Sequence, residues 1–233
     1  MRFLALLLTV LTGATGLVYE VTWQKYLSTL LGSHSEATAA VLGIFLAGLS
    51  VGYGLFGRLT RAQVARAAGS GRPPRLLATY GLIEAGIGVY ALLFPAFFGL
   101  VQRLSFAIPH GAAGVGFAFD VALAALLILP PTILMGGTIP ILTQALSRSL
   151  EDATRFHAFV YAFNTAGAVA GALAASFLLV PWLGLRNVMF AMGAVNVLVG
   201  ATFLALSGRP VPMAGATAES AAAPVRRSRE LLV

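Results

Sequence analysis

The sequence contains no cysteine among its 233 residues. This absence excludes disulfide bonds, zinc sites built on thiolates and cysteine nucleophiles. Charged residues are also scarce at 10% of the chain, whereas soluble domains carry about 25%. Hydrophobic residues make up 58%, and the mean hydropathy is +0.89. So few charges cannot cover the surface of a soluble domain, and the composition therefore predicts an integral membrane protein.

Two further kinds of site find no support in the sequence. The net charge is +7, but no basic stripe is interleaved with aromatic residues, as a nucleic-acid groove requires. The histidines His34, His110 and His157 show neither metal-ligand spacing nor a nucleophile–base arrangement. We therefore expect no nucleic-acid partner, no metal, no cofactor and no catalytic residues. Catalysis within the membrane is the least favoured interpretation, although whether the chain is an enzyme stays open.

Six apolar runs are long enough to span a bilayer, which takes roughly 20 residues. They cover residues 3–31, 37–56, 76–100, 114–146, 156–182 and 186–206. The fourth run contains Pro130, Pro131 and Pro140, so we expect it to kink or break there. We predict an all-α domain of about six transmembrane helices over residues 1–206. Residues 207–233 are rich in proline, alanine and arginine, and are predicted to form a flexible basic tail or linker.

The positions of the basic residues predict how these helices are oriented. Most arginines lie after the second run, after the fourth run and in the tail, and Lys25, Arg103 and Arg186 lie on the opposite side. Since basic residues concentrate in cytoplasmic loops, both termini should be cytoplasmic, and we expect the inner (plasma) membrane of a bacterium. The start of the chain also fits a signal peptide. Its apolar and aromatic character continues to Leu31, which favours a retained helix.

Two patterns of small residues predict where helices pack closely. GLSVG (Gly48–Gly52) and GAVAG (Gly167–Gly171) both place glycines one helical turn apart. Small residues let backbones approach each other in a bilayer, where lipid supplies no hydrophobic drive for helix association. Glycine is common in membrane helices generally, but the two patterns together favour a packed bundle over loose helices.

Three polar residues are predicted to lie near the middle of the membrane. Glu84 lies about 12 Å from the cytoplasmic start of its run at a rise of about 1.5 Å per residue. Asp120 and Asn164 lie comparably deep in theirs. No lysine or arginine is expected at this level. Either these groups are neutral and form hydrogen bonds to neighbouring helices, or a positively charged species binds to them, such as a proton, a metal ion or an organic amine.

The stretch GATGLVYEVTWQKYL (residues 12–26) carries polar residues at the far end of the first run. Glu20 lies about 26 Å along that helix, near the outer boundary. Tyr19 and Trp23 are typical of an interfacial aromatic belt. Glu20 and Gln24 share a helix face, and we expect them to line an outer vestibule.

Five segments occur in an order that resembles a known family. They are GLVYEVTWQKYLSTLLGS, LAGLSVGYGLFGRL, LIEAGIGVYALL, LPPTILMGGTIPILTQAL and YAFNTAGAVAGALAASFLLVPWLGLR. Together, over residues of about 10 to 206, they resemble the transmembrane part of membrane-bound spermidine synthase-like proteins, described as fused major-facilitator/spermidine synthase proteins. GYGLFGRLTR is also similar to the major-facilitator motif that follows a second helix, but Thr60 and Arg61 stand where an acidic residue is usual.

The resemblance implies half of a major-facilitator transporter, built from two inverted three-helix repeats, with the fourth helix as the counterpart of the first. Members of the family commonly continue into a soluble aminopropyltransferase domain of Rossmann-like fold. That domain holds decarboxylated S-adenosylmethionine and a polyamine at a glycine-rich loop. The 233 residues contain no GxGxG loop after a strand, so the resemblance assigns no catalytic residue to this chain.

Two interpretations of function follow. In the first, the chain is a membrane module that binds or moves a small cationic metabolite, with a polyamine as the candidate. The candidate ligand-binding residues are Glu84, Asp120, Asn164, Glu20, Tyr161 and Gln24. In the second, the chain is a non-catalytic anchor or assembly subunit for a soluble aminopropyltransferase or a larger membrane complex. Six helices would need a second copy to enclose a pathway, so a homodimer is expected in the first case.

Overall fold

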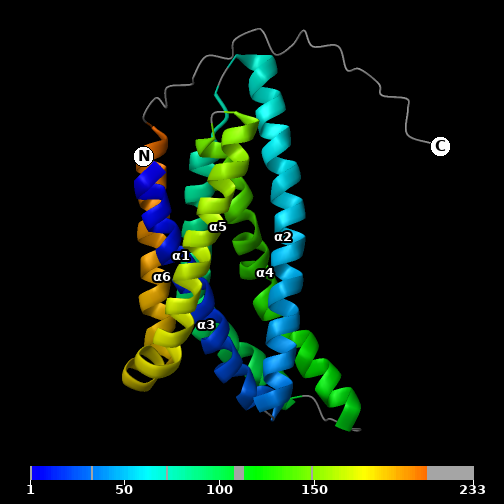
Figure 1. Ribbon diagram of the computed structural model, residues 1–233. Coiled ribbons are helices and arrows are strands. Elements are labelled where there is room, and N and C mark those ends of the chain that lie inside the picture. Colours follow the sequence, from blue (N-terminus) through cyan, green and yellow to red (C-terminus); the bar gives the residue numbers. More distant parts are fainter. Residues whose placement is uncertain (1, 33, 72, 108–112, 148, 209–233) are drawn as a thin grey trace, which may run out of the picture.

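The computed structural model describes residues 2–32, 34–71, 73–107, 113–147 and 149–208. These residues form helices α1 (Arg2–Leu31), α2 (His34–Ser70), α3 (Leu76–Ala107), α4 (Ala113–Leu146), α5 (Leu150–Ala174) and α6 (Val180–Ser207), with a π-helical turn η1 (Ala175–Leu179). No strand occurs in the described ranges. Figure 1 shows the helices as one bundle, so the predicted all-α class is confirmed. The expected tail, residues 207–233, lies outside the described part after Gly208.

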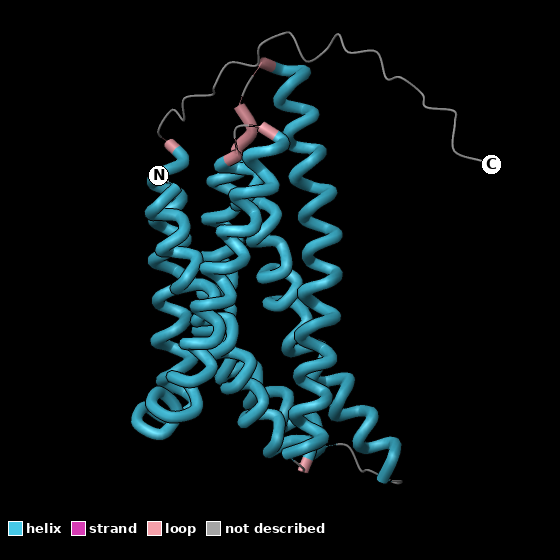
Figure 2. The backbone as a smooth tube through the Cα atoms, in the orientation of Figure 1, coloured by secondary structure: helices cyan, strands magenta, loops and turns pink. Residues whose placement is uncertain are grey.

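Five helices among the described residues are long and apolar enough to cross a membrane. They are Arg2–Leu31, Ser35–Ser70, Leu76–Ala107, Val115–Leu146 and Glu151–Ser207. The chain is therefore an integral membrane protein by this criterion, but the predicted count of six is not established. The last run joins α5, η1 and α6 and bends sharply at Gly184, whose φ of 72° and ψ of 162° are not helical. Figure 2 shows the two arms meeting at this bend.

Of the kink or break expected in the fourth helix, the break is wrong. Pro130, Pro131 and Pro140 all lie inside α4, which runs without interruption from Ala113 to Leu146. Proline at position 131 cannot donate to the carbonyl of Leu127, four residues earlier. The hydroxyl of Tyr90 on α3 donates to this carbonyl at 2.9 Å instead. A neighbouring helix thus replaces a lost backbone hydrogen bond, as tolerance of proline in a membrane helix requires.

The helices pack in three main pairs. α1 packs against α5, α2 against α4 and α3 against α6. If α1 is exchanged with α4, α2 with α5 and α3 with α6, the same three pairs result. Such an exchange is what two inverted three-helix repeats require. The likeness to half of a major-facilitator transporter remains a prediction.

The predicted close packing at the glycine patterns is confirmed. A Cβ atom added to Gly52 on α2 would overlap the carbonyl of Ile133 on α4. One added to Gly167 on α5 would overlap the carbonyl of Val10 on α1. The backbones therefore touch at both patterns, and this contact sets how each pair of helices is rotated.

One end of the bundle is held together by Arg2. Its guanidinium forms an ion pair with Asp152 on α5 and donates to the carbonyl of Leu146 at the end of α4, with Nε at 3.0 Å. The guanidinium also lies over the ring of Phe156, 5.0 Å from its centre. Figure 1 shows the start of α1, the start of α5 and the connection from α2 to α3 at this same end. The regions predicted to be cytoplasmic thus lie on one side.

Candidate functional site

A cavity of about 390 Å³ lies within the bundle and is lined by residues of all six α-helices. Its polar lining side chains are Thr12, Thr15, Tyr53, Glu84, Thr138, His157, Tyr161, Asn164, Thr165 and Asn196. Apolar side chains such as Phe45 and Ile87 complete it. The volume and the mixed lining are typical of a small-molecule site, for which about 300–1,000 Å³ is usual.

Glu84 is held in the wall of this cavity by a chain of hydrogen bonds. Its Oε2 accepts from Nδ2 of Asn196 at 2.7 Å. Oδ1 of Asn196 accepts in turn from the hydroxyl of Tyr19 at 2.9 Å. Glu84 is 1% exposed, and Tyr19 and Asn196 are equally buried. The three residues come from α3, α6 and α1, so the chain joins three helices at one point.

The second carboxyl oxygen of Glu84 is different. Oε1 is buried and has no hydrogen-bond partner among the described residues. The hydroxyl of Tyr80, one turn earlier on α3, faces both Glu84 and Thr12 without completing a hydrogen bond to Oε1. A buried polar atom without a partner is rare, because it loses its bonds to water and gains none. Glu84 therefore lines the cavity and also keeps one buried carboxyl oxygen without a partner among the described residues.

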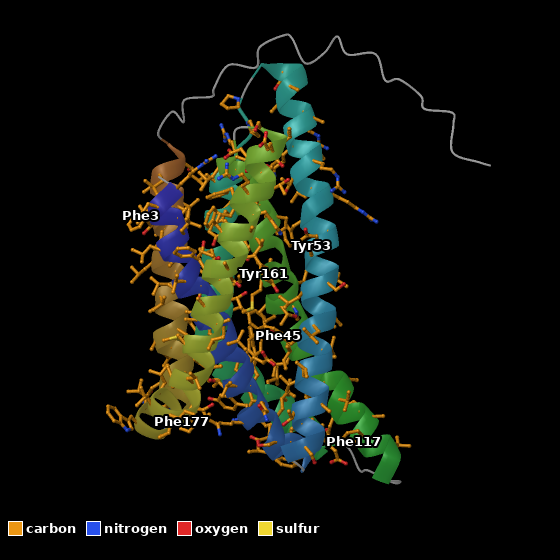
Figure 3. The ribbon with its side chains drawn as sticks, viewed as in Figure 1. Phe3, Phe45, Tyr53, Phe117, Tyr161 and Phe177 are labelled. Atoms are coloured by element: carbon orange, nitrogen blue, oxygen red, sulfur yellow. The ribbon has the colours of Figure 1, made fainter. Side chains whose placement is uncertain are left out.

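Aromatic side chains surround one side of the cavity. Figure 3 shows Tyr161 on α5 and Tyr53 on α2 flanking the region in which Phe45 lies. Tyr161 is 58% exposed and Tyr53 is 54% exposed, although both line the cavity. These two side chains therefore extend from the cavity lining to the outer surface of α2 and α5.

The structure brings together three of the six predicted site residues. Glu84, Asn164 and Tyr161 line the same cavity. Asn164 and Tyr161 lie on one face of α5 with His157, a face that the sequence analysis identified only in part. The structure thus supplies a common space for residues that were chosen separately by their depth in the membrane.

The other three predicted residues do not line this cavity. Asp120 accepts a hydrogen bond from Ser105 at 2.6 Å, close to the end of α3 and away from Glu84. Gln24 on α1 donates a hydrogen bond to Thr38 on α2 and does not line the cavity. Glu20 is half-buried on α1 and lies outside the lining. These three residues therefore do not share the cavity with Glu84.

The interfacial role expected for Tyr19 and Trp23 is wrong. Both side chains are at most 1% exposed, and their rings stack with centres 5.6 Å apart. Trp23 also packs against Phe45 and Phe94. Aromatic residues near a helix end resemble an interfacial belt in sequence, but here this face of α1 turns toward its neighbours.

Asn196 also lines the cavity and was not among the residues predicted from the sequence. It lies in the apolar segment AVNVLV of the last run, and the argument from depth applied to Asn164 applies to it equally. Tyr19 was noticed but given a different role. Neither residue could be linked to Glu84 from spacing alone, because the three lie on separate helices.

Two other features do not offer a better site. A cavity of about 440 Å³ near Arg2, Asp152 and Arg155 lies at the end of the bundle, where acidic and basic side chains already neutralise one another. No cluster of three metal-ligating side chains occurs in the part of the chain that the structure describes. Nδ1 of His157 lies 3.2 Å from the Thr143 hydroxyl.

Comparison with known proteins identifies two curated relatives. Polyamine aminopropyltransferase 2 of Streptomyces coelicolor is 28% identical over 204 residues, which cover 87% of this chain and 34% of that protein. The polyamine aminopropyltransferase of Corynebacterium efficiens is 28% identical over 203 residues, which cover 84% of this chain and 34% of its own length. No protein-family model matches the chain, and no solved structure matches it.

The chain thus spans about a third of the length of the curated relatives that it matches. The likeness extends over most of this chain. The distant similarity to polyamine aminopropyltransferases agrees with the family resemblance seen in the sequence.

Proposed function

We propose that this chain is a membrane-embedded module that binds or moves a small organic cation, with polyamines as the first candidates. The observation that carries the proposal is that Glu84 lines the cavity and that its buried Oε1 has no partner among the described residues. The names of the two relatives support the choice of amines.

The charges around the cavity favour a cationic ligand. A carboxylate at membrane depth is costly unless a positive group neutralises it. The described lining contains no lysine or arginine. An ammonium group would supply both the charge and the donor that Oε1 lacks. Tyr53, Tyr161 and Phe45 add ring faces, which attract cations by roughly 0.5–2 kcal/mol.

The membrane arrangement is part of the proposal. The run Glu151–Ser207 has 57 residues, and a straight helix of that length would measure about 85 Å at about 1.5 Å per residue. A bilayer core is about 30 Å thick. We propose that α5 and α6 cross it separately with the bend at Gly184 between them, which makes six crossings with both termini cytoplasmic in a bacterial inner membrane.

The names of the relatives favour a second candidate function. Both are named polyamine aminopropyltransferases, and this chain matches about a third of each, so the matched membrane region would serve as an anchor or assembly subunit for a soluble aminopropyltransferase or a larger complex. A stable partner that co-purifies from native membranes would support this function. A homodimer without other subunits would instead favour the ligand-binding function.

Equilibrium binding of radiolabelled putrescine and spermidine to the purified protein tests the first proposal. The variant is Glu84→Gln, which keeps the shape of the side chain and removes its charge. The control is Asp120→Asn, the same kind of change at a carboxyl group outside the cavity. We expect saturable binding that Glu84→Gln abolishes and Asp120→Asn leaves intact. Equal binding by a folded Glu84→Gln protein would refute the proposal.

A further inference from the structure

We infer that the cavity is built to pair with one positive charge, so that among the amines it binds it prefers one with a single ammonium group and an uncharged tail, such as an N-acylated polyamine, over a fully charged polyamine. This inference rests on the proposed function and narrows it. It concerns the number of charges that Glu84 and its neighbours can neutralise.

Asn196 is the residue that limits the charge. Its amide nitrogen donates to Glu84 at 2.7 Å, and its amide oxygen accepts from Tyr19 at 2.9 Å. These two bonds fix the orientation of the amide, which carries no charge. An aspartate has nearly the same size and shape as this asparagine. At this position it would give the site a second carboxyl group directly beside the first. The sequence instead places a neutral donor there, and the site keeps a single acidic group.

The rest of the lining agrees with a single charge. Glu84 is the one acidic residue among the described residues that line the cavity. The other polar groups are hydroxyls, amides and the imidazole of His157. Asp120 bonds to Ser105 and lies outside this lining. These groups can solvate a polar tail, but none of them carries a negative charge that could pair with a second ammonium group.

A doubly charged amine would therefore bind with a penalty. Its first ammonium group would pair with Oε1 of Glu84. Its second would be buried without a counter-charge, which is strongly unfavourable. An amine of equal length whose far end is a neutral amide would avoid this penalty and could bond to groups such as Asn164 or Thr138. The chemical class that fits is a primary amine with a neutral polar or apolar tail.

Competition binding with putrescine and N-acetylputrescine tests the inference, because the two share the same diaminobutane chain and N-acetylputrescine carries a neutral acetamide in place of one ammonium group. We expect N-acetylputrescine to compete at least about tenfold more strongly, as about 1.4 kcal/mol of unpaired charge would require. If both amines bind and putrescine is the stronger, the inference is wrong while the proposed function stands. If neither binds, the proposed function fails and this inference fails with it.

Asn196→Asp provides a second measurement. By adding an acid beside Glu84, it should shift the preference toward putrescine by about tenfold or more relative to the native protein. The matched control is Asn187→Asp, the same change on α6 at an exposed asparagine that bonds only to its own helix, at the Leu183 carbonyl. An unchanged preference in folded Asn196→Asp would overturn the role of Asn196. If that variant does not fold, the comparison of the two amines on the native protein still decides the inference.

Discussion

Asn196 on α6 donates a hydrogen bond to Glu84 on α3 at 2.7 Å, across the closely packed pair that these two helices form. The bond satisfies one carboxyl oxygen and leaves the other without a partner. It therefore both fixes the position of the carboxyl group and determines which of its oxygens is left without a partner. Glycines make this approach possible, because a Cβ atom at Gly88 would lie 2.6 Å from the carbonyl of Gly193 on α6.

Removing the Tyr19 hydroxyl should weaken the chain of hydrogen bonds without emptying the core. Tyr19→Phe loses the bond to Asn196 and should lower the free energy of unfolding by roughly 0.5–1.5 kcal/mol. Thermal unfolding of the protein in detergent would measure the change. Tyr53→Phe is the control, since this side chain is 54% exposed. Equal stability of both variants would show that the bond contributes nothing.

The contact between α2 and α4 should depend on Gly52. A Cβ atom there would overlap the carbonyl of Ile133, whereas one at Gly54, two residues along the same helix, meets nothing within 4 Å. We expect Gly52→Ala to destabilise the protein by about 1–3 kcal/mol, because overpacking forces the backbones apart. Gly54→Ala should be neutral or slightly stabilising. Similar melting temperatures for the two variants would contradict this account of the interface.

The ion pair between Arg2 and Asp152 should hold the end of the bundle. Both side chains are partly exposed, at 34% and 28%, so water screens the pair and each single change should cost only about 1 kcal/mol. The exchange Arg2→Asp with Asp152→Arg should recover part of this loss. Denaturant unfolding of the two single variants and the double variant would measure the recovery. A double variant that loses the full sum of both single effects would argue against a direct interaction.

The absence of cysteine makes the membrane arrangement easy to test. We expect a cysteine introduced by Trp182→Cys, at an 81% exposed position near the bend at Gly184, to react with an impermeant thiol reagent from the outside of intact cells. Ser70→Cys, at the end of α2, should react only after the cells are opened. Labelling of both variants from the same side would refute separate crossings by α5 and α6.

The accuracy of the sequence predictions varied with the kind of interaction involved. The close contacts at Gly48–Gly52 and Gly167–Gly171 were predictable, because small residues at this spacing leave room for a neighbouring backbone. The prolines of α4 predicted a kink or a break, and the break does not occur; the hydroxyl that replaces a lost donor there belongs to Tyr90 on another helix, which the sequence does not reveal. Glu84, Asn164 and Tyr161, which were chosen from the sequence, line one cavity. The separation of Asp120 from them was not predictable.

The sequence by itself determined that this protein belongs in a membrane and is built from helices, because hydropathy adds up along the chain regardless of what each segment contacts. It also determined which polar residues lie within the apolar runs, where burial in the bilayer costs free energy. Only the tertiary structure decided which of them meet. Tyr19, Glu84 and Asn196 lie on three helices, with Tyr19 and Asn196 separated by 177 residues. Their meeting depends on the rotation of each helix about its axis, which is set by packing between helices and not by the apolar character of any one of them.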